Sequence, residues 1–283
     1  MRIAIVGRGR IGAGLGLAWT RGGAHVTLLA RSAGATHGLP VVIGRDVWPE
    51  TIGPTDCLVI ATPDREIPGV ARELAQRHTF NARHVVLHTS GLLDRTALDP
   101  LATSGAALGS LHPLMAVSRA EDAPAQLKGA FAGIEGDPAA VAMADRLATL
   151  AGLTPVPIPS GAKAGYHAAA AMVSNFTVTL YDAARRVAEQ NGMAPDSAAR
   201  IYLPLLRGTV ANLEALEPAS ALTGAIRRGD AETVAAHVRA LQSDDLRRLY
   251  VELGKATLRL AREAGLDEAA AERVGGVLGV DRR

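Results

Sequence analysis

Three polar side chains share one face of a long apolar helix that the sequence predicts from Lys163 onward. Lys163 and His167 are four residues apart and Ser174 follows seven residues later, so helical periodicity puts all three on the same side. An ammonium or imidazolium beside a carbonyl or imine can donate the proton that accompanies hydride delivery, and it can stabilise the developing negative charge. The stripe therefore predicts general acid chemistry at Lys163 or His167. The alternative for Lys163 is a residue that only begins the helix at its solvent end, because lysine is usually exposed.

Two further polar residues follow apolar runs earlier in the chain. Ser90 comes directly after the run at residues 85–89, and His112 directly after the run at residues 107–111. Parallel strands bring their carboxyl ends to one edge of a sheet, where ligands bind. We therefore expect Ser90 and His112 to hydrogen-bond a substrate carboxylate or hydroxyl. A structural turn histidine is the alternative for His112, which precedes a proline.

A glycine-rich loop follows the first apolar run of the chain, Arg2–Val6. Gly7, Gly9 and Gly12 have the spacing GxGxxG and lead into an apolar helix. The first glycine permits a tight turn, the second lets the backbone approach a pyrophosphate, and the third packs the helix on the strand. The helix N-terminus attracts the anion. The expected dinucleotide-binding loop comprises Gly7, Arg8, Gly9, Arg10, Ile11 and Gly12.

Arg31 and Ser32 follow the second apolar run, about twenty residues after the loop. An NAD-binding domain carries Asp or Glu at this point, where the carboxylate holds the ribose 2′-hydroxyl. A guanidinium binds a 2′-phosphate bidentately, and the missing carboxylate removes a group that would repel it. The sequence therefore favours NADP(H) over NAD(H). A solvated loop charge is the alternative for Arg31.

The segment Ala61, Thr62 and Pro63 follows another buried run, at the edge of the sheet where ligands bind. We expect its backbone to pass over the cofactor. The next residue, Asp64, is expected to cap the helix that follows, because Asp is a preferred N-cap residue.

Composition and charge narrow the possible partners. A formal charge of +2 gives no excess basic field, so neither nucleic acid nor an anionic membrane is expected. The histidines lack a clustered spacing with thiols or carboxylates, and no metal is expected. Residues 164–181 contain no charged side chain, yet their polar residues predict a helix buried in protein rather than a membrane span. The chain runs directly into a strand without a signal peptide, which favours a cytoplasmic location.

The elements that must position these residues fall into two halves. The first half alternates apolar runs with helical patterns, which predicts a doubly wound, mostly parallel sheet. The expected strands are residues 2–6, 25–30, 57–61, 85–89, 107–111, 130–135 and 154–158. Only helical patterns follow, at residues 163–191, 195–215, 231–243, 244–265 and 267–274. We therefore expect an α/β Rossmann domain over residues 1–158 and an all-α C-terminal domain over residues 159–283.

Several short segments, together with the glycine loop, resemble one family. They are His88 to Gly91, Gly109 to Pro113, Lys163 with Tyr166 and His167 through Ser174 and Asn175, Leu222 to Gly224, and Arg228 to Asp230. The chain resembles, over nearly its whole length, Rossmann-like proteins with a C-terminal domain of unknown function called DUF2520, in the 6-phosphogluconate dehydrogenase-like group. Two residues depart from the pattern. Arg8 stands where a small residue is commoner, so that it would crowd or clasp the pyrophosphate, and Ala225 stands where Pro is commoner.

The resemblance implies relatives among pyrroline-5-carboxylate reductase, prephenate dehydrogenase and ketopantoate reductase. In such reductases the first long helix after the Rossmann domain approaches the nicotinamide. Lys163 would lie there, with Ser174 and Asn175 further along the same helix, while Arg228 would hold an anionic substrate. The expected function is NADP(H)-dependent reduction of a small carbonyl or imine compound bearing a carboxylate, with a ketopantoate-like 2-keto acid as one candidate.

The rival hypothesis is a protein that binds NADP(H) without turnover and signals through its helical domain. Under either hypothesis the long Ala-rich helix is a surface suited to pairing across a two-fold axis, so a homodimer is expected.

Overall fold

The chain folds into two compact units in the computed structural model, which describes residues 1–280 except 45, 47 and 54. The first unit is Met1–Ser174, and the second begins at Asn175.

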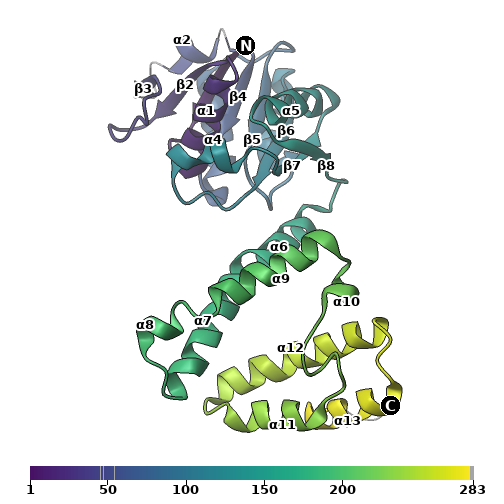
Figure 1. Ribbon diagram of the computed structural model, residues 1–283. Coiled ribbons are helices and arrows are strands. Elements are labelled where there is room, and N and C mark those ends of the chain that lie inside the picture. The colour runs from purple at the N-terminus through teal and green to yellow at the C-terminus, as the bar shows by residue number, and fades with distance from the viewer. Residues whose placement is uncertain (45, 47, 54, 281–283) are drawn as a thin grey trace. The chain divides into compact units, whose positions relative to one another are not determined.

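An eight-stranded sheet forms the centre of the first unit (Figure 1). The strand order is β3-β2-β1-β4-β5-β6-β7-β8, and neighbouring strands are parallel except for β6 with β7. The strands are β1 Arg2–Val6, β2 His25–Ala30, β3 Val41–Ile43, β4 Cys57–Ile60, β5 Val85–His88, β6 Ala107–Leu114, β7 Phe131–Gly136 and β8 Thr154–Pro157. The order reverses between β1 and β4, the point at which doubly wound sheets bind ligands. The expected Rossmann architecture is therefore confirmed.

Helices cover both faces of the sheet, because the strands present apolar side chains alternately to two cores. In β1, Ile3 and Ile5 belong to one core and Ala4 and Val6 to the other. The first core is closed by α1 Arg10–Arg21, α4 Ala123–Gln126 and α5 Pro138–Leu150. The second is closed by α2 Trp48–Ile52, α3 Ile67–Arg77 and the 3₁₀ helix η3 Arg95–Ser104. Two short 3₁₀ turns, η2 Asp64–Glu66 and η4 Ala120–Asp122, complete the connections.

The first unit extends beyond the last strand, which ends at Pro157 close to the predicted boundary at residue 158. Helix α6, Lys163–Val173, belongs to this unit because the side chain of Lys163 is anchored against the sheet. The predicted division at residues 158 and 159 therefore falls one helix earlier than the division between compact units. As a statement about domains it stays a prediction.

The second unit consists of helices throughout its described residues, as expected. They are α7 Asn175–Gln190, α8 Pro195–Ala198, α9 Leu203–Ala215, α10 Pro218–Ala221, α11 Ala231–Ala240, α12 Asp244–Glu263 and α13 Glu268–Val277. A small core of Val234, Leu258, Ala271, Val274 and Leu278 holds α11, α12 and α13 together.

The single helix expected over residues 163–191 is interrupted at Ser174. Its backbone angles, φ −96° and ψ −70°, depart from helical values. Serine and asparagine side chains compete for backbone hydrogen bonds, which weakens a helix at such a position. None of the described helices combines the length and the apolarity that a membrane crossing requires.

Candidate cofactor pocket and active site

A pocket of about 300 Å³ lies at the carboxyl ends of β1, β2 and β4. Among the residues expected to bind the cofactor, its lining includes Gly7, Arg8, Gly9, Arg31, Ser32, Ala61, Thr62 and Pro63. Glu66, Glu73 and Trp48 also line it, and sequence reasoning had not placed them there. Arg10, Ile11 and Gly12 lie in the first turn of α1, outside the lining.

The three glycines of the loop are required for different reasons. Gly7 has φ +111°, and a Cβ there would lie 2.6 Å from the carbonyl oxygen of Ala61. A Cβ on Gly12 would lie 2.5 Å from the carbonyl oxygen of Gly7, so this residue packs α1 against the loop. A Cβ on Gly9 would meet no protein atom within 4 Å. The first and third glycines therefore serve the fold, whereas Gly9 leaves space for a ligand.

Two polar atoms in the pocket lining fit a dinucleotide. Nη1 of Arg8 and Oγ1 of Thr62 are buried, and neither has a hydrogen-bond partner among the described residues. Buried polar atoms are rarely left unpaired, so each such atom needs an explanation. A phosphate or ribose oxygen in this pocket would satisfy both. The residues present therefore fit an NADP(H)-type cofactor.

Arg31 is exposed at the pocket and forms an ion pair. Its Nη2 lies 3.1 Å from Oε2 of Glu66, with the Arg31 side chain 61% exposed and that of Glu66 31% exposed. Exposed ion pairs contribute about 1 kcal/mol or less, so a phosphate could displace the carboxylate at little cost.

Lys163 is buried at the edge of the sheet, against residues from two neighbouring strand ends. Only 3% of the residue is exposed. Its Nζ donates to the carbonyl oxygen of Ser90 at 2.7 Å and to Oγ of Ser110 at 2.9 Å. Burial lowers the pKa of Lys163 to about 8, although the negative charges of Glu135, Asp64 and Asp94 oppose that shift. The alternative of a solvent-exposed helix start is therefore wrong for this lysine.

Ser110 links Lys163 to a half-buried carboxylate. Its Oγ donates to Oε1 of Glu135 at 2.7 Å while it accepts from the lysine. Ser110 and Glu135 are directly opposite each other in the antiparallel β6–β7 pair. Two hydrogen bonds through Ser110 thus connect the buried Lys163 ammonium to the Glu135 carboxylate, and Glu135 is partly exposed to solvent.

His112 is held in a defined neutral form by Tyr166. The Tyr166 oxygen accepts from the backbone N–H of Gly133, so its own proton is available for Nδ1 of His112, 3.0 Å away. Burial, together with the nearby charge of Lys163, lowers the pKa of His112 to about 4. At neutral pH its Nε2 therefore carries the ring proton and the imidazole is uncharged.

His167 lies beside His112, with their ring centroids 5.7 Å apart. Gly91 lies between them, because a Cβ there would be 2.4 Å from Nδ1 of His167 and 2.8 Å from Nε2 of His112. Nδ1 of His167 is buried without a hydrogen-bond partner in the described part of the chain. Lys163, His112 and His167 are therefore gathered at one point, as their spacing and strand positions predicted.

The loop after β5 is fixed by its own polar residues. The Ser90 hydroxyl donates to Oδ2 of Asp64 at 2.8 Å and accepts from the backbone N–H groups of Leu92 and Leu93. Since both lone pairs and the proton of this hydroxyl are used, Ser90 offers the site its carbonyl rather than its side chain. Asp64 does not cap a helix, contrary to expectation, because its carboxylate faces Ser90 and η2 has no side-chain cap.

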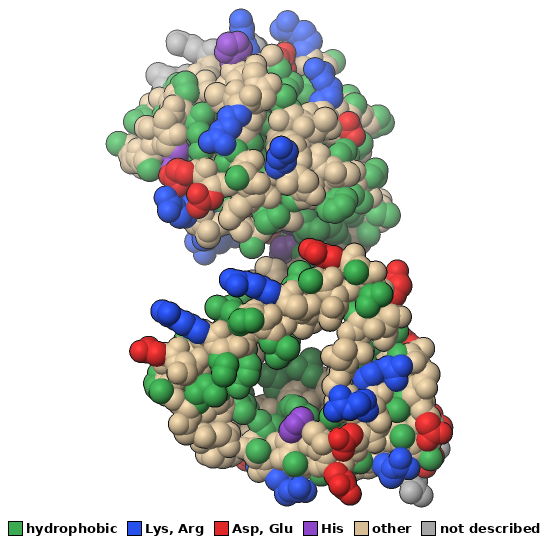
Figure 2. Space-filling model, in the orientation of Figure 1, with side chains coloured by type: hydrophobic (Ala, Val, Ile, Leu, Met, Phe, Trp, Pro, Cys, Tyr) green, Lys and Arg blue, Asp and Glu red, His purple; other side chains and the backbone are tan. Residues whose placement is uncertain are grey.

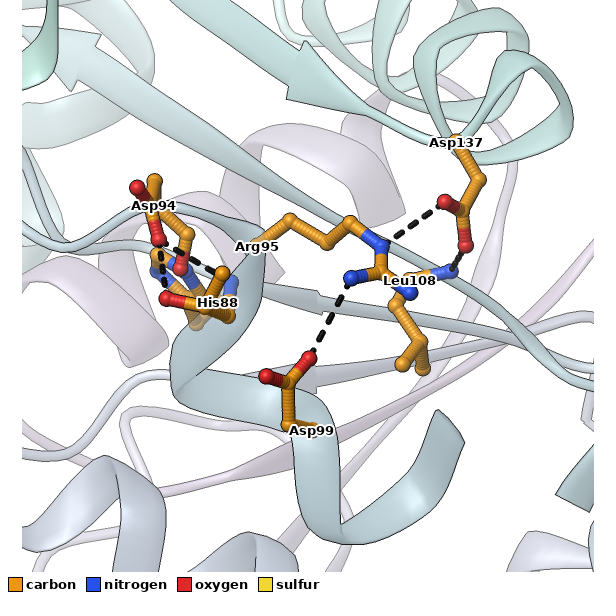
Figure 3. A network of polar contacts seen from close by, with 7 residues as sticks. His88, Asp94, Arg95, Asp99, Leu108 and Asp137 are labelled. Atoms are coloured by element: carbon orange, nitrogen blue, oxygen red, sulfur yellow. Dashed lines mark hydrogen bonds and ion pairs between the residues drawn. The ribbon is translucent and has the colours of Figure 1, made fainter. Parts of the chain in front are cut away.

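His88 and Asp94 complete this loop (Figure 3). Nε2 of His88 donates to the carbonyl oxygen of Asp94, and Nδ1 accepts from the backbone N–H of Ser90. Burial lowers the pKa of His88 to about 4, so it stays neutral and structural. The next residue, Arg95, bonds to Asp137 and Asp99, and this ties η3 to the start of α5. The His88 contacts thus hold the loop whose Ser90 carbonyl accepts from Lys163.

Three further predicted site residues have roles that the geometry of this cluster does not test. Ser174 is exposed at the end of α6, eleven residues beyond Lys163, which is about 16 Å along a helix. Asn175 and Arg228 are exposed in the second unit. Their roles stay predictions.

Comparisons with known proteins agree with this architecture. A Rossmann-like domain matches residues 1–113, and the domain of unknown function DUF2520 matches residues 130–257. No match was found among curated protein sequences.

Two solved structures share the fold over most of both chains. Protein TM1727 from Thermotoga maritima has 24% identity and a TM-score of 0.72, and the match covers 92% of this chain and 98% of that one. The proposed NADP oxidoreductase BF3122 from Bacteroides fragilis has 20% identity and a TM-score of 0.72, with 90% and 96% covered.

A more distant likeness is to Plasmodium falciparum pyrroline carboxylate reductase with NADP bound. It has 12% identity and a TM-score of 0.60, and 98% of each chain is covered. The fold thus places the chain among two-domain proteins that begin with a Rossmann-like domain. More narrowly, this chain combines that domain with a DUF2520 domain, so the resemblance seen in the sequence is confirmed.

Proposed function

We propose that the chain is an NADP(H)-dependent oxidoreductase that reduces a small carbonyl or imine compound bearing a carboxylate. The observation that carries the proposal is the buried Lys163 ammonium, which lies at the sheet edge that also forms the dinucleotide pocket. When bound, NADPH supplies the hydride. A ketopantoate-like 2-keto acid is one candidate substrate.

Lys163 is the residue best suited to donate the proton. An ammonium has three N–H groups, and within the described chain Ser90 and Ser110 accept two of them, which leaves one for a substrate oxygen or nitrogen. With a pKa of about 8 the lysine is largely protonated at neutral pH and yet gives up its proton readily. His112, with a pKa of about 4, is neutral and has no such proton to give. We assign proton donation to Lys163.

The two histidines are suited to orient the substrate. Nε2–H of His112 is directed into the site beside Gly91, and His167 lies opposite it. An uncharged N–H donor can hold a carboxylate or hydroxyl oxygen without competing with Lys163 for a charge. Arg228 stays a candidate for the same carboxylate.

Glu135 is suited to keep Lys163 protonated. Its carboxylate accepts from the Ser110 hydroxyl, which in turn accepts from the Lys163 ammonium. The negative charge of Glu135 raises the pKa of Lys163 and so favours the form that can donate a proton.

Steady-state assays test the proposal directly. NADPH oxidation would be followed with a panel of 2-keto acids and cyclic imines. Consumption with at least one compound supports the oxidoreductase. Tight NADPH binding without turnover of any compound would favour the rival hypothesis, a protein that senses NADP(H).

Cofactor preference gives a sharper expectation. Arg31→Ala should weaken NADPH binding by roughly tenfold, since it removes a charge-assisted contact to the 2′-phosphate, and it should change NADH binding much less. Calorimetric titration of both cofactors measures the two losses. Equal losses would contradict a role for Arg31 at the 2′-phosphate.

A homodimer is the proposed assembly. Leu205, Val210 and Leu213 of α9, together with Leu216 directly after it, are 49–68% exposed, and Figure 2 shows exposed apolar side chains on the second unit. Large exposed apolar patches mark interaction surfaces. Sedimentation should give about twice the 29.3 kDa mass of the chain, and Leu205→Glu should shift it to the monomer. A monomeric mass for the unaltered protein would refute the assembly.

A further inference from the structure

Arg8 reaches away from the glycine loop and lies against the segment that follows β2. Its Nη2 donates to the carbonyl oxygen of Ala33 at 2.6 Å. The guanidinium also fills the space beside Gly34, where a Cβ would lie 2.1 Å from Nη1. The side chain therefore bridges two loops of the sheet edge.

The Arg8 guanidinium is only partly satisfied by these contacts. Nη1 is buried and has no hydrogen-bond partner among the described residues. A cationic N–H in that state calls for an anionic acceptor. The expected acceptor lies within the pocket, because Arg8 is part of its lining.

Arg31 and Ser32 line the same pocket and precede Ala33 directly. Two arginines from different loops therefore line the same pocket. Glu66 balances one of them through its ion pair with Arg31. The remaining positive charge matches a dianionic phosphate better than it matches an uncharged ribose hydroxyl.

We propose that Arg8 is a specificity-determining residue that binds the 2′-phosphate of NADP(H) together with Arg31 and Ser32. Gly34 is needed beside it because a side chain there would occupy the position of the guanidinium. This inference rests on the proposed NADP(H) binding. It moves the role of Arg8 from the pyrophosphate, where its place in the loop suggested it, to the 2′ position of the adenosine ribose.

Binding of two fragments tests the assignment without turnover. The probes are 2′,5′-ADP, which carries the 2′-phosphate, and 5′-ADP, which carries the pyrophosphate instead. Arg8→Met should weaken calorimetric binding of 2′,5′-ADP by roughly tenfold or more and change 5′-ADP binding by less than about twofold. Arg65→Met is the matched control, because Arg65 is exposed next to Glu66 but does not line the pocket. It should leave both affinities unchanged.

Gly34→Ala provides an independent second variant. It keeps the arginine but displaces the guanidinium, so it should reproduce the selective loss for 2′,5′-ADP. Thermal melting without ligand shows whether each variant is folded. A loss shared equally by the two fragments, or no loss in either variant, would overturn the inference while the NADP(H) proposal stands. If the unaltered protein binds neither NADPH nor 2′,5′-ADP, both fall together.

Discussion

Replacing Lys163 with Met should lower the rate of carbonyl or imine reduction by about 10²–10⁴-fold, the usual contribution of a positioned general acid. NADPH binding should stay within about twofold, because the Lys163 contacts are with Ser90 and Ser110 and not with the pocket lining. Single-turnover rates of NADPH oxidation measure the first quantity, and fluorescence titration of NADPH the second. Lys128→Met, which removes an exposed lysine, is the matched control.

The pH dependence of the reduction rate distinguishes a proton-donating Lys163 from a lysine with a purely structural role. Burial lowers the Lys163 pKa from 10.5 to about 8, and only the protonated ammonium can donate. The reduction rate should therefore be full below about pH 8 and fall roughly tenfold per pH unit above it. Glu135→Gln removes a charge that raises the Lys163 pKa, so it should move the falling limb to lower pH. A flat profile through pH 8, or an unaltered rate in Lys163→Met, would contradict the assignment.

The strands and the glycine loop could be predicted because their signals are local. Parallel strands buried on both faces are continuous apolar runs, as in Cys57–Ile60. Strand β3 has only three residues, and the sequence shows no such run for it. Helix α6 ends at Ser174 through a local distortion within a pattern whose periodicity continues, which is why one long helix was expected.

The active site was predictable in its principal residues but not in their partners. Lys163, His112 and His167 could be grouped from strand ends and helical spacing. The Ser110–Glu135 pair depends on the register of an antiparallel strand pair that joins residues 25 positions apart, and no local pattern specifies that register. The direction of Arg8 depends in the same way on Gly34, which lies in a different loop. Ser90 was assigned by residue type to the substrate, whereas its hydroxyl is used by Asp64 and two backbone N–H groups.

Gly9 and Gly12 of the glycine loop are expected to have different roles, Gly9 in ligand binding and Gly12 in the structure of the loop. Gly9→Ala should lower NADPH affinity at least roughly hundredfold and leave the melting temperature nearly unchanged. A Cβ at Gly9 meets no protein atom within 4 Å, and its φ of −68° suits alanine, but the methyl group would stand where the pyrophosphate must approach the backbone. Calorimetric titration of NADPH and differential scanning calorimetry of the free protein measure the two quantities.

Gly12→Ala supplies the contrast, because its Cβ would lie 2.5 Å from the Gly7 carbonyl oxygen and 3.0 Å from the Ala61 side chain. Neither the Gly7 carbonyl nor the Ala61 side chain can shift without moving the loop away from β4. Overpacking of this kind costs about 1–3 kcal/mol of stability, so the Gly12→Ala variant should melt several degrees lower. Gly69→Ala, an exposed helical position whose new Cβ would meet only the end of the Arg72 side chain, should leave binding unchanged. Full NADPH affinity in a folded Gly9→Ala variant would mean that the pyrophosphate does not lie on this loop. The dinucleotide site would then have to be sought elsewhere on the sheet edge.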